Sequence, residues 1–110
     1  MELMKSAFVS LALCTIFGAA AVAASFSGTV VDVMCRGKDL ASHTRECALT
    51  CARTGFGLVT PDGKFLKFDE AGNARTLSAL RKATQEKDLK AVVTGDAEGD
   101  MIKVQSIALQ

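Results

Sequence analysis

Four side chains with metal-binding and redox chemistry lie close together in the sequence, in the order Cys35, His43, Cys47 and Cys51. The last three are spaced four residues apart, which would place them on one face of an α-helix. Three thiolates and one imidazole form a common closed zinc site, and such ligands favour Zn²⁺ or a copper ion over Ca²⁺ or Mg²⁺. The spacing therefore predicts a metal site made of these four residues.

A structural disulfide is the main alternative to a metal ion. Helical residues four apart hold their Cβ atoms about 5 to 6 Å apart, whereas a disulfide needs about 3.5 to 4.5 Å. A bond between Cys47 and Cys51 would distort the helix, so the predicted disulfide joins Cys35 to one of them and leaves one thiol over. Such a loop, of roughly 11 to 15 residues, would stabilise a small domain by about 3 kcal/mol in the chain-entropy model. This alternative predicts an interaction or ligand-binding module without a metal.

Thiol chemistry is a third interpretation, because a thiolate beside an imidazolium is a nucleophile. His43 and Cys47 are candidates for such a pair. However, the spacing is neither the CxxC of thioredoxins nor the CxxCH of covalent haem attachment, and no orienting or oxyanion motif accompanies it. We therefore expect a binding or structural module rather than an enzyme, with thiol redox chemistry as the less favoured alternative.

The start of the predicted helix decides how His43 can be used. With Ser42 as N-cap, His43 lies in the first turn, and three ligands along one straight helix strain a tetrahedral site because each four-residue step drifts about 40°. With Thr44 as N-cap, His43 lies just outside the helix and turns inward more freely. The second start suits a metal site better.

Two neighbours of the cysteine and histidine residues have chemistry of their own. Asp32 is either a hydrogen-bond acceptor for His43 or a solvated carboxylate at the end of a strand. Met34 is either a soft thioether ligand, which would favour copper, or a core side chain. Met34 precedes Cys35 directly and Asp32 lies three residues before it, so the structure can decide between these alternatives.

Residues 1–24 have the pattern of a secretory signal peptide. Lys5 precedes an apolar run at 7–20, which is followed by small residues and is shorter than the roughly 20 residues of a spanning helix. Cleavage would leave a periplasmic or secreted domain at 25–110 without a stable membrane span. It would also remove Cys14 and leave three cysteines, an odd number for a compartment that oxidises thiols.

Composition excludes several classes of partner. The formal charge of +1 does not change on cleavage, because Lys5 and Glu2 are lost together. Such a balance gives no electrostatic case for binding nucleic acid. The chain also lacks Trp and Tyr, the residues on which carbohydrate and single-stranded nucleic acids stack. The expected partner is therefore an unknown protein or a small ligand.

The elements that must position the cluster are predicted to be mainly β. Five stretches rich in β-branched or apolar residues are bounded by turn residues, namely 26–35, 56–60, 65–68, 89–96 and 101–109. A Cys/His helix is predicted to run to about Thr54 and to end at Gly55. After a loop at 69–73, a second helix is predicted from its cap Thr76 to Ala83. This order, with one helix after the first strand and one between the third and fourth, is that of a five-stranded OB-like β-barrel.

Four short β patterns also carry a family resemblance: Gly28-Thr29-Val30-Val31-Asp32, Asp62-Gly63-Lys64, Val92-Val93-Thr94-Gly95 and Ile102-Lys103-Val104. With them, residues 25–110 resemble the small secreted OB-fold-like proteins of bacteria, an uncharacterised family. A plain OB barrel does not need the Cys/His segment, which resembles an insert after the first strand in secreted proteins of this type. The resemblance implies the barrel and implies no activity.

Overall fold

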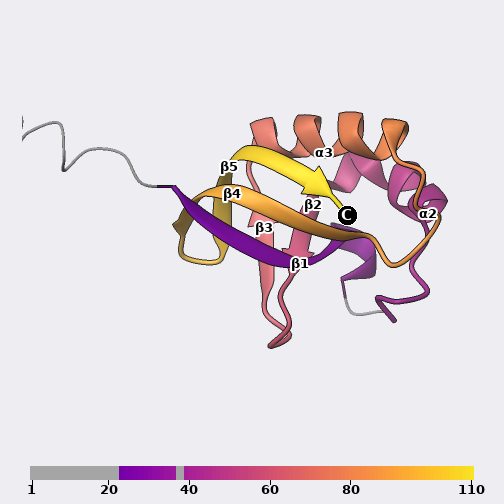
Figure 1. Ribbon diagram of the computed structural model, residues 1–110, viewed down its shortest axis with the longest axis horizontal. Coiled ribbons are helices and arrows are strands. Elements are labelled where there is room, and N and C mark those ends of the chain that lie inside the picture. Colours follow the sequence, from indigo (N-terminus) through magenta and orange to yellow (C-terminus); the bar gives the residue numbers. More distant parts are fainter. Residues whose placement is uncertain (1–22, 37–38) are drawn as a thin grey trace, which may run out of the picture.

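A computed structural model describes residues 23–36 and 39–110. Five strands form a closed barrel in the order β1-β2-β3-β5-β4. Their bounds are Ala24–Asp32 (β1), Phe56–Val59 (β2), Phe65–Phe68 (β3), Lys90–Glu98 (β4) and Met101–Leu109 (β5). Neighbouring strands are antiparallel except β3 and β5, which are parallel. The predicted five-stranded OB-like barrel is confirmed (Figure 1).

Helical segments connect the strands at two places in the described part of the chain. Between β1 and β2 lie a 3₁₀ turn at Val33–Cys35 (η1), the helix Arg45–Thr50 (α2) and a second 3₁₀ turn at Ala52–Thr54 (η2). Between β3 and β4 lies the helix Glu70–Lys82 (α3), which packs against β5 and crosses one side of the barrel (Figure 1). No helix within the described ranges is both long and apolar enough to cross a membrane.

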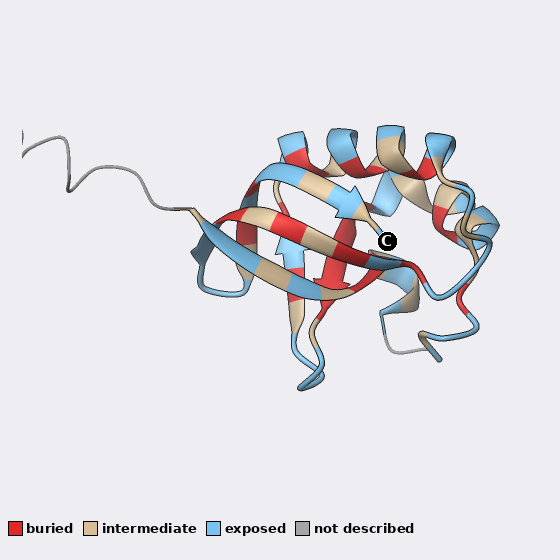
Figure 2. Cartoon of the chain, viewed as in Figure 1, coloured by how far each residue is buried: buried red, intermediate tan, exposed pale blue. Residues whose placement is uncertain are grey.

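The hydrophobic core fills the barrel interior and extends beneath both helices. Along β4, the buried residues Ala91, Val93 and Gly95 alternate with more accessible ones, as expected of a strand with one face inward. Leu80 of α3 and Ala48 of α2 are fully buried in the same cluster as the strand residues. Figure 2 shows buried segments along the strands and on the part of α3 that faces the barrel. The core therefore fixes both helices on the barrel.

The helix α3 begins earlier than the sequence predicts. A loop is predicted at 69–73 and a helix from Thr76, whereas α3 begins at Glu70. The cause is Asp69, the N-cap, whose Oδ1 accepts the backbone N–H of Gly72 at 2.9 Å. The predicted cap is instead a buried residue within the helix.

Tertiary contacts explain why weak helix formers stand in the first turns of α3. Gly72 and Asn73 both have low helix propensity. A Cβ at Gly72 would lie only 2.6 Å from Cγ2 of Val104, so glycine allows α3 to approach β5 closely. Asn73 Oδ1 accepts the backbone N–H of Phe56 at 2.8 Å. These two contacts join the start of α3 to β5 and β2.

The predicted hairpin around Pro61-Asp62-Gly63 is confirmed by the antiparallel pairing of β2 and β3. Gly63 has φ 86°, in the left-handed region that glycine adopts without strain. The Thr60 hydroxyl donates a hydrogen bond to Asp62 Oδ1. This bond is the main reason why the pKa of the Asp62 carboxyl lies below its ordinary value.

Most of the predicted signal peptide lies outside the described residues, as does Cys14. The described chain starts at residue 23, and β1 begins at Ala24. The first strand therefore begins one residue before the predicted domain boundary at 25, and cleavage stays a prediction.

Candidate metal centre

The end of β1 brings Asp32 and Cys35 to the same side of the backbone. The sequence predicts that this strand continues to Cys35, in which case side chains three residues apart would point to opposite faces. Instead β1 ends at Asp32, and η1 follows. A 3₁₀ turn has about three residues per turn, so it returns Cys35 to the side of Asp32. The bond from the N–H of Val33 to the carbonyl of Gly55, at 2.9 Å, fixes this turn against the start of β2.

His43 reaches the same point from the segment that precedes α2. Thr44 is the N-cap of α2, and its hydroxyl accepts the backbone N–H of Cys47 at 3.0 Å. His43 therefore lies just outside the helix, as the second of the two predicted starts requires. Its side chain is 3% exposed, and its Nε2 lies 2.7 Å from Asp32 Oδ1. The prediction that Asp32 is a hydrogen-bond partner of His43 is confirmed.

The segment after α3 holds the start of α2 in place. The backbone N–H of Arg45 donates to the carbonyl of Glu86 at 2.8 Å, and its Nε donates to the carbonyl of Gln85 at 3.1 Å. Thr44 forms an isolated antiparallel bridge with Lys87. These contacts fix the backbone next to His43, so its ring is oriented by the fold.

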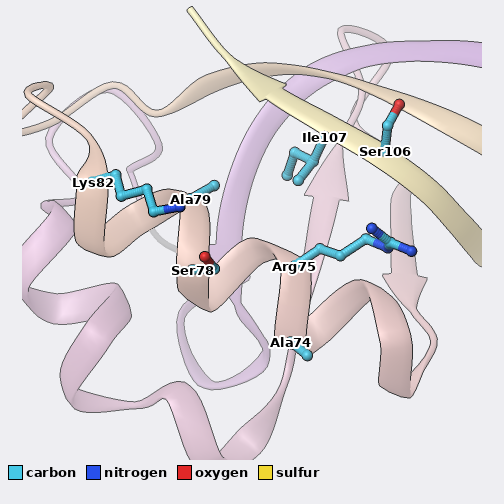
Figure 3. Close-up of a pocket in the computed structure, with 7 residues that line it drawn as sticks. All are labelled: Ala74, Arg75, Ser78, Ala79, Lys82, Ser106 and Ile107. Atoms are coloured by element: carbon cyan, nitrogen blue, oxygen red, sulfur yellow. The ribbon is translucent and has the colours of Figure 1, made fainter.

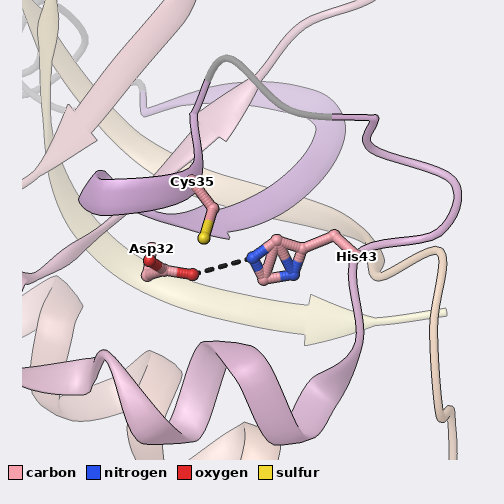
Figure 4. Close-up of side chains that lie close together, drawn as sticks. All are labelled: Asp32, Cys35 and His43. Carbon is pink, nitrogen blue, oxygen red and sulfur yellow. Dashed lines mark hydrogen bonds and ion pairs between the residues drawn. The ribbon is translucent and has the colours of Figure 1, made fainter.

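Asp32, Cys35 and His43 form one compact group of ligand atoms. One ligand atom from each residue lies within 4.8 Å of the other two. Figure 4 shows the Cys35 thiol and the His43 ring directed toward the Asp32 carboxylate. In a tetrahedral zinc site with bonds of about 2.0 to 2.3 Å, ligand atoms are about 3.3 to 3.8 Å apart. The group therefore needs only small side-chain adjustments to surround an ion.

Asp32 has an unusual hydrogen-bonding state for a fully buried carboxylate. The residue is 0% exposed, and its Oδ2 has no hydrogen-bond partner among the described residues. Leaving a buried polar atom unsatisfied costs about 1 to 3 kcal/mol, and more for a charged group. Buried carboxylates are normally paired or coordinate metals, so this oxygen is a candidate metal ligand.

The two remaining predicted ligands lie outside this group. Cys47 is exposed in the first turn of α2, and Cys51 is half-buried just beyond its last turn. Together with Cys35, they line a pocket of about 270 Å³. Cys47, Cys35 and His43 also line an adjoining pocket of about 300 Å³. Whether Cys47 and Cys51 bind a metal stays a prediction.

The predicted Cys/His helix is shorter than expected. α2 ends at Thr50, and η2 continues to Gly55, whose φ of 89° ends the helical segment as predicted. The hydroxyls of Thr50 and Thr54 donate to backbone carbonyls one turn earlier, at 2.9 and 2.8 Å, a pattern that weakens helices. The predicted stripe is therefore divided, with His43 before the N-cap, Cys47 within α2 and Cys51 at its C-cap.

The structure differs from two further predictions, the disulfide at Cys35 and the placement of Met34 in the core. No disulfide joins any two of the described cysteines. The alternative prediction from the sequence is a disulfide between Cys35 and either Cys47 or Cys51. Met34 is 67% exposed, so it is not a core side chain. Its thioether lies in solvent next to Cys35 in the chain.

Sequence reasoning missed that Asp32 belongs to the ligand group itself. The signal was present, because Asp32 follows the apolar residues Val30 and Val31, which are fully buried. A carboxylate at the end of such a run is rarely buried without a partner. The sequence could not show that the turn after it would bring Cys35 back to the same side.

A wider pocket, of about 560 Å³, lies between α3 and β5 (Figure 3). Its lining includes the cationic side chains of Arg75 and Lys82 and the hydroxyls of Ser78 and Ser106. It contains no thiol, imidazole or carboxylate, and its positive charges oppose a cation. This pocket is therefore not a metal site.

Fold and site together define a small closed five-stranded barrel with a candidate Asp/Cys/His metal group. Comparison with family models, curated proteins and solved structures gives no match for the chain. The resemblance to secreted OB-like proteins that the sequence suggests is supported only by the five-stranded barrel. Any functional conclusion must come from the geometry of the site.

Proposed function

We propose that this protein is a small extracytoplasmic metal-binding module in which Asp32, Cys35 and His43 bind one Zn²⁺ or copper ion. The observation that carries the proposal is the fully buried Asp32 oxygen without a partner among the described residues. Asp32 lies in a group with a thiol and an imidazole, a donor set that suits these metals. The extracytoplasmic location is supported by the signal-peptide pattern of residues 1–24.

The orientation of the His43 ring supports a ligand role for Nε2. Its Nδ1 lies 3.2 Å from the carbonyl oxygen of Thr44, an acceptor that favours a proton on Nδ1. Metal-binding histidines commonly donate one ring N–H to a backbone carbonyl, which leaves the lone pair of the other nitrogen for the metal. Here that other nitrogen makes the hydrogen bond to Asp32, so a metal ion bound in the group would take the place of the proton in that bond.

The same ring geometry favours a binding role over nucleophilic catalysis. A catalytic Cys–His–Asp arrangement needs one ring nitrogen facing the thiol and the other facing the carboxylate. In this structure, both ring nitrogens of His43 have an oxygen within hydrogen-bond distance. Asp32 occupies Nε2, and a backbone carbonyl lies at Nδ1, so convergence of the three side chains on an ion is the better account.

A fourth ligand position would face the adjoining pocket of about 300 Å³. Cys47 lies on the wall of this pocket, together with Cys35 and His43. Either Cys47 or a solvent molecule can complete a four-coordinate ion there. The proposed site therefore keeps two or three of the four ligands predicted from the sequence and adds Asp32.

Titration of the reduced protein with Co²⁺ tests this proposal, because Co²⁺ substitutes for Zn²⁺ and its absorption reports thiolate ligands. We expect one equivalent to bind, with a sulfur-to-cobalt charge-transfer band. The Cys35→Ser variant should lose at least half of the intensity of this band, and His43→Gln should weaken binding at least tenfold.

The matched control is Asp96→Asn, which removes an exposed carboxylate from β4 and should titrate like the wild type. Circular dichroism spectra of all variants would show whether each retains its fold. Binding that is weak and non-stoichiometric, or equal in the wild type and Cys35→Ser, would contradict the proposal.

A further inference from the structure

Three cysteines line one pocket beside the proposed site, although their sulfur atoms are not gathered within 4.8 Å of one another as the ligand atoms of Asp32, Cys35 and His43 are. Cys35, Cys47 and Cys51 line one pocket of about 270 Å³, whereas Asp32 and His43 do not line it. Cys35 and Cys47 also line the adjoining pocket with His43, whereas Cys51 lines the sulfur pocket alone. We propose that these three cysteines form a second site, which binds Cu(I).

The chemistry of the pocket matches a soft cation of low charge. Thiolate and thioether ligands select Cu(I), and Cu(I) is stable with three sulfur ligands, whereas structural Zn²⁺ is almost always four-coordinate. The other lining residues are Thr44, Glu46 and Thr50. The pocket thus has an acidic residue and no basic one, which favours a cation.

The exposure of the sulfur atoms provides a route of entry for the ion. Cys47 is exposed, and Cys35 and Cys51 are half-buried, so the pocket is accessible from solvent. Met34 is 67% exposed and is the one large hydrophobic side chain with such exposure in the described ranges. Met34 precedes Cys35 directly in the chain but does not line the pocket. Binding would release the thiol protons to solvent and needs no redox step.

The local backbone allows the three sulfur atoms to adjust around an ion. Cys35 ends a 3₁₀ turn, and Cys51 is the residue between α2 and η2. Neither is in the middle of a regular helix or strand, where its side chain would be tied to a fixed spacing. Only Cys47 is fixed within α2. This site shares Cys35 with the proposed Asp32/Cys35/His43 site but does not require that site to exist.

The experiment is an anaerobic titration of the reduced protein with Cu(I), in competition with a chromophoric Cu(I) chelator. Cys51 lines the sulfur pocket and not the adjoining pocket that contains His43, so Cys51→Ser separates the two sites. We expect Cys51→Ser to weaken Cu(I) binding at least tenfold and to leave Co²⁺ binding unchanged. His43→Gln should do the reverse. Thr50→Val, which removes a lining hydroxyl, should bind Cu(I) like the wild type.

Wild-type Cu(I) binding by Cys51→Ser would overturn this inference. Loss of Cu(I) and Co²⁺ binding together in His43→Gln would also overturn it, because the two ions would then use one site. Absence of Co²⁺ binding with retained, Cys51-dependent Cu(I) binding would instead contradict the proposed Asp32/Cys35/His43 site alone.

Discussion

Two aspartates at the ends of barrel strands are used in opposite ways. Asp69 follows β3, and its Oδ1 accepts the backbone N–H groups of Gly72 and Val104 at 2.9 and 3.1 Å. Asp32 ends β1, and its carboxylate faces His43 through one oxygen and has no described partner at the other. The same residue type therefore supports the fold where backbone amides satisfy it, and offers a ligand where they do not.

The two aspartates also differ in their effect on the stability of the fold. Asp69 links α3 to β5, so its hydrogen bonds contribute to folding directly. Asp32 carries an unsatisfied oxygen worth about 1 to 3 kcal/mol of lost stability, in a chain whose closed barrel and continuous core supply the stability. A bound ion would offset that cost, because any ligand that binds the folded state alone stabilises it.

The largest effect is expected when the two aspartates are changed in the same way and zinc affinity is measured. Asp32→Asn removes a charged ligand, so it should lower Zn²⁺ affinity by about 100-fold, at the upper end of the losses caused by changes around metal ligands. Asp69→Asn should leave the affinity unchanged. Competition with a chromophoric zinc chelator measures both variants. Equal losses in the two variants would show that Asp32 acts only through the fold.

The next largest effect is expected on folding stability, where Asp69 rather than Asp32 is the important residue. Asp69→Ala leaves two backbone N–H groups without their acceptor, so it should lower the free energy of unfolding by about 2 to 3 kcal/mol. Urea denaturation of the metal-free protein measures this loss. The control Asp96→Ala, at an exposed position, should change stability by less than about 0.5 kcal/mol. A similarly small change in Asp69→Ala would contradict the claim that Asp69 stabilises the fold.

A smaller effect is expected at the N-cap beside the metal group. Thr44 accepts one backbone N–H, that of Cys47, whereas Asp69 accepts two. Thr44→Ala should therefore destabilise the metal-free protein by about 1 kcal/mol, while Thr44→Ser, which keeps the hydroxyl, should be nearly neutral. Chemical denaturation would measure both. A loss as large as that of Asp69→Ala would mean that Thr44 does more than cap α2.

The smallest effect concerns Asp62, an aspartate that is exposed in the hairpin turn. The Thr60 hydroxyl lowers the pKa of Asp62, so Thr60→Val should raise this pKa toward its ordinary value. Because the pKa is lowered in the folded state, the stabilising effect is present at neutral pH and is lost as the pH falls through the lowered pKa. Carboxyl chemical shifts followed by NMR against pH measure the change. An unchanged titration curve in the variant would contradict the assigned cause.

The strands were predictable because their signals are local. The turn residues Pro61 and Gly63 mark the hairpin, and alternation around Val93 marks β4. The start of α3 was not predictable, because its glycine and asparagine are explained only by contacts with β5 and β2. In the candidate site, Cys35 and His43 were predicted together, and Asp32 was predicted as a partner. The turn η1, which brings Asp32 and Cys35 together, depends on a bond to Gly55 across the fold and has no local sequence signal.

The central claim is that a metal ion is bound by Asp32, Cys35 and His43. X-ray absorption at the zinc edge of the reduced, zinc-loaded and desalted protein tests it most directly, because Zn–S bonds of about 2.3 Å are separated from Zn–N and Zn–O bonds of about 2.0 to 2.2 Å. We predict one stoichiometric zinc ion with nitrogen and oxygen ligands and one or two sulfur ligands. Three sulfur ligands, or no retained zinc, would contradict the account.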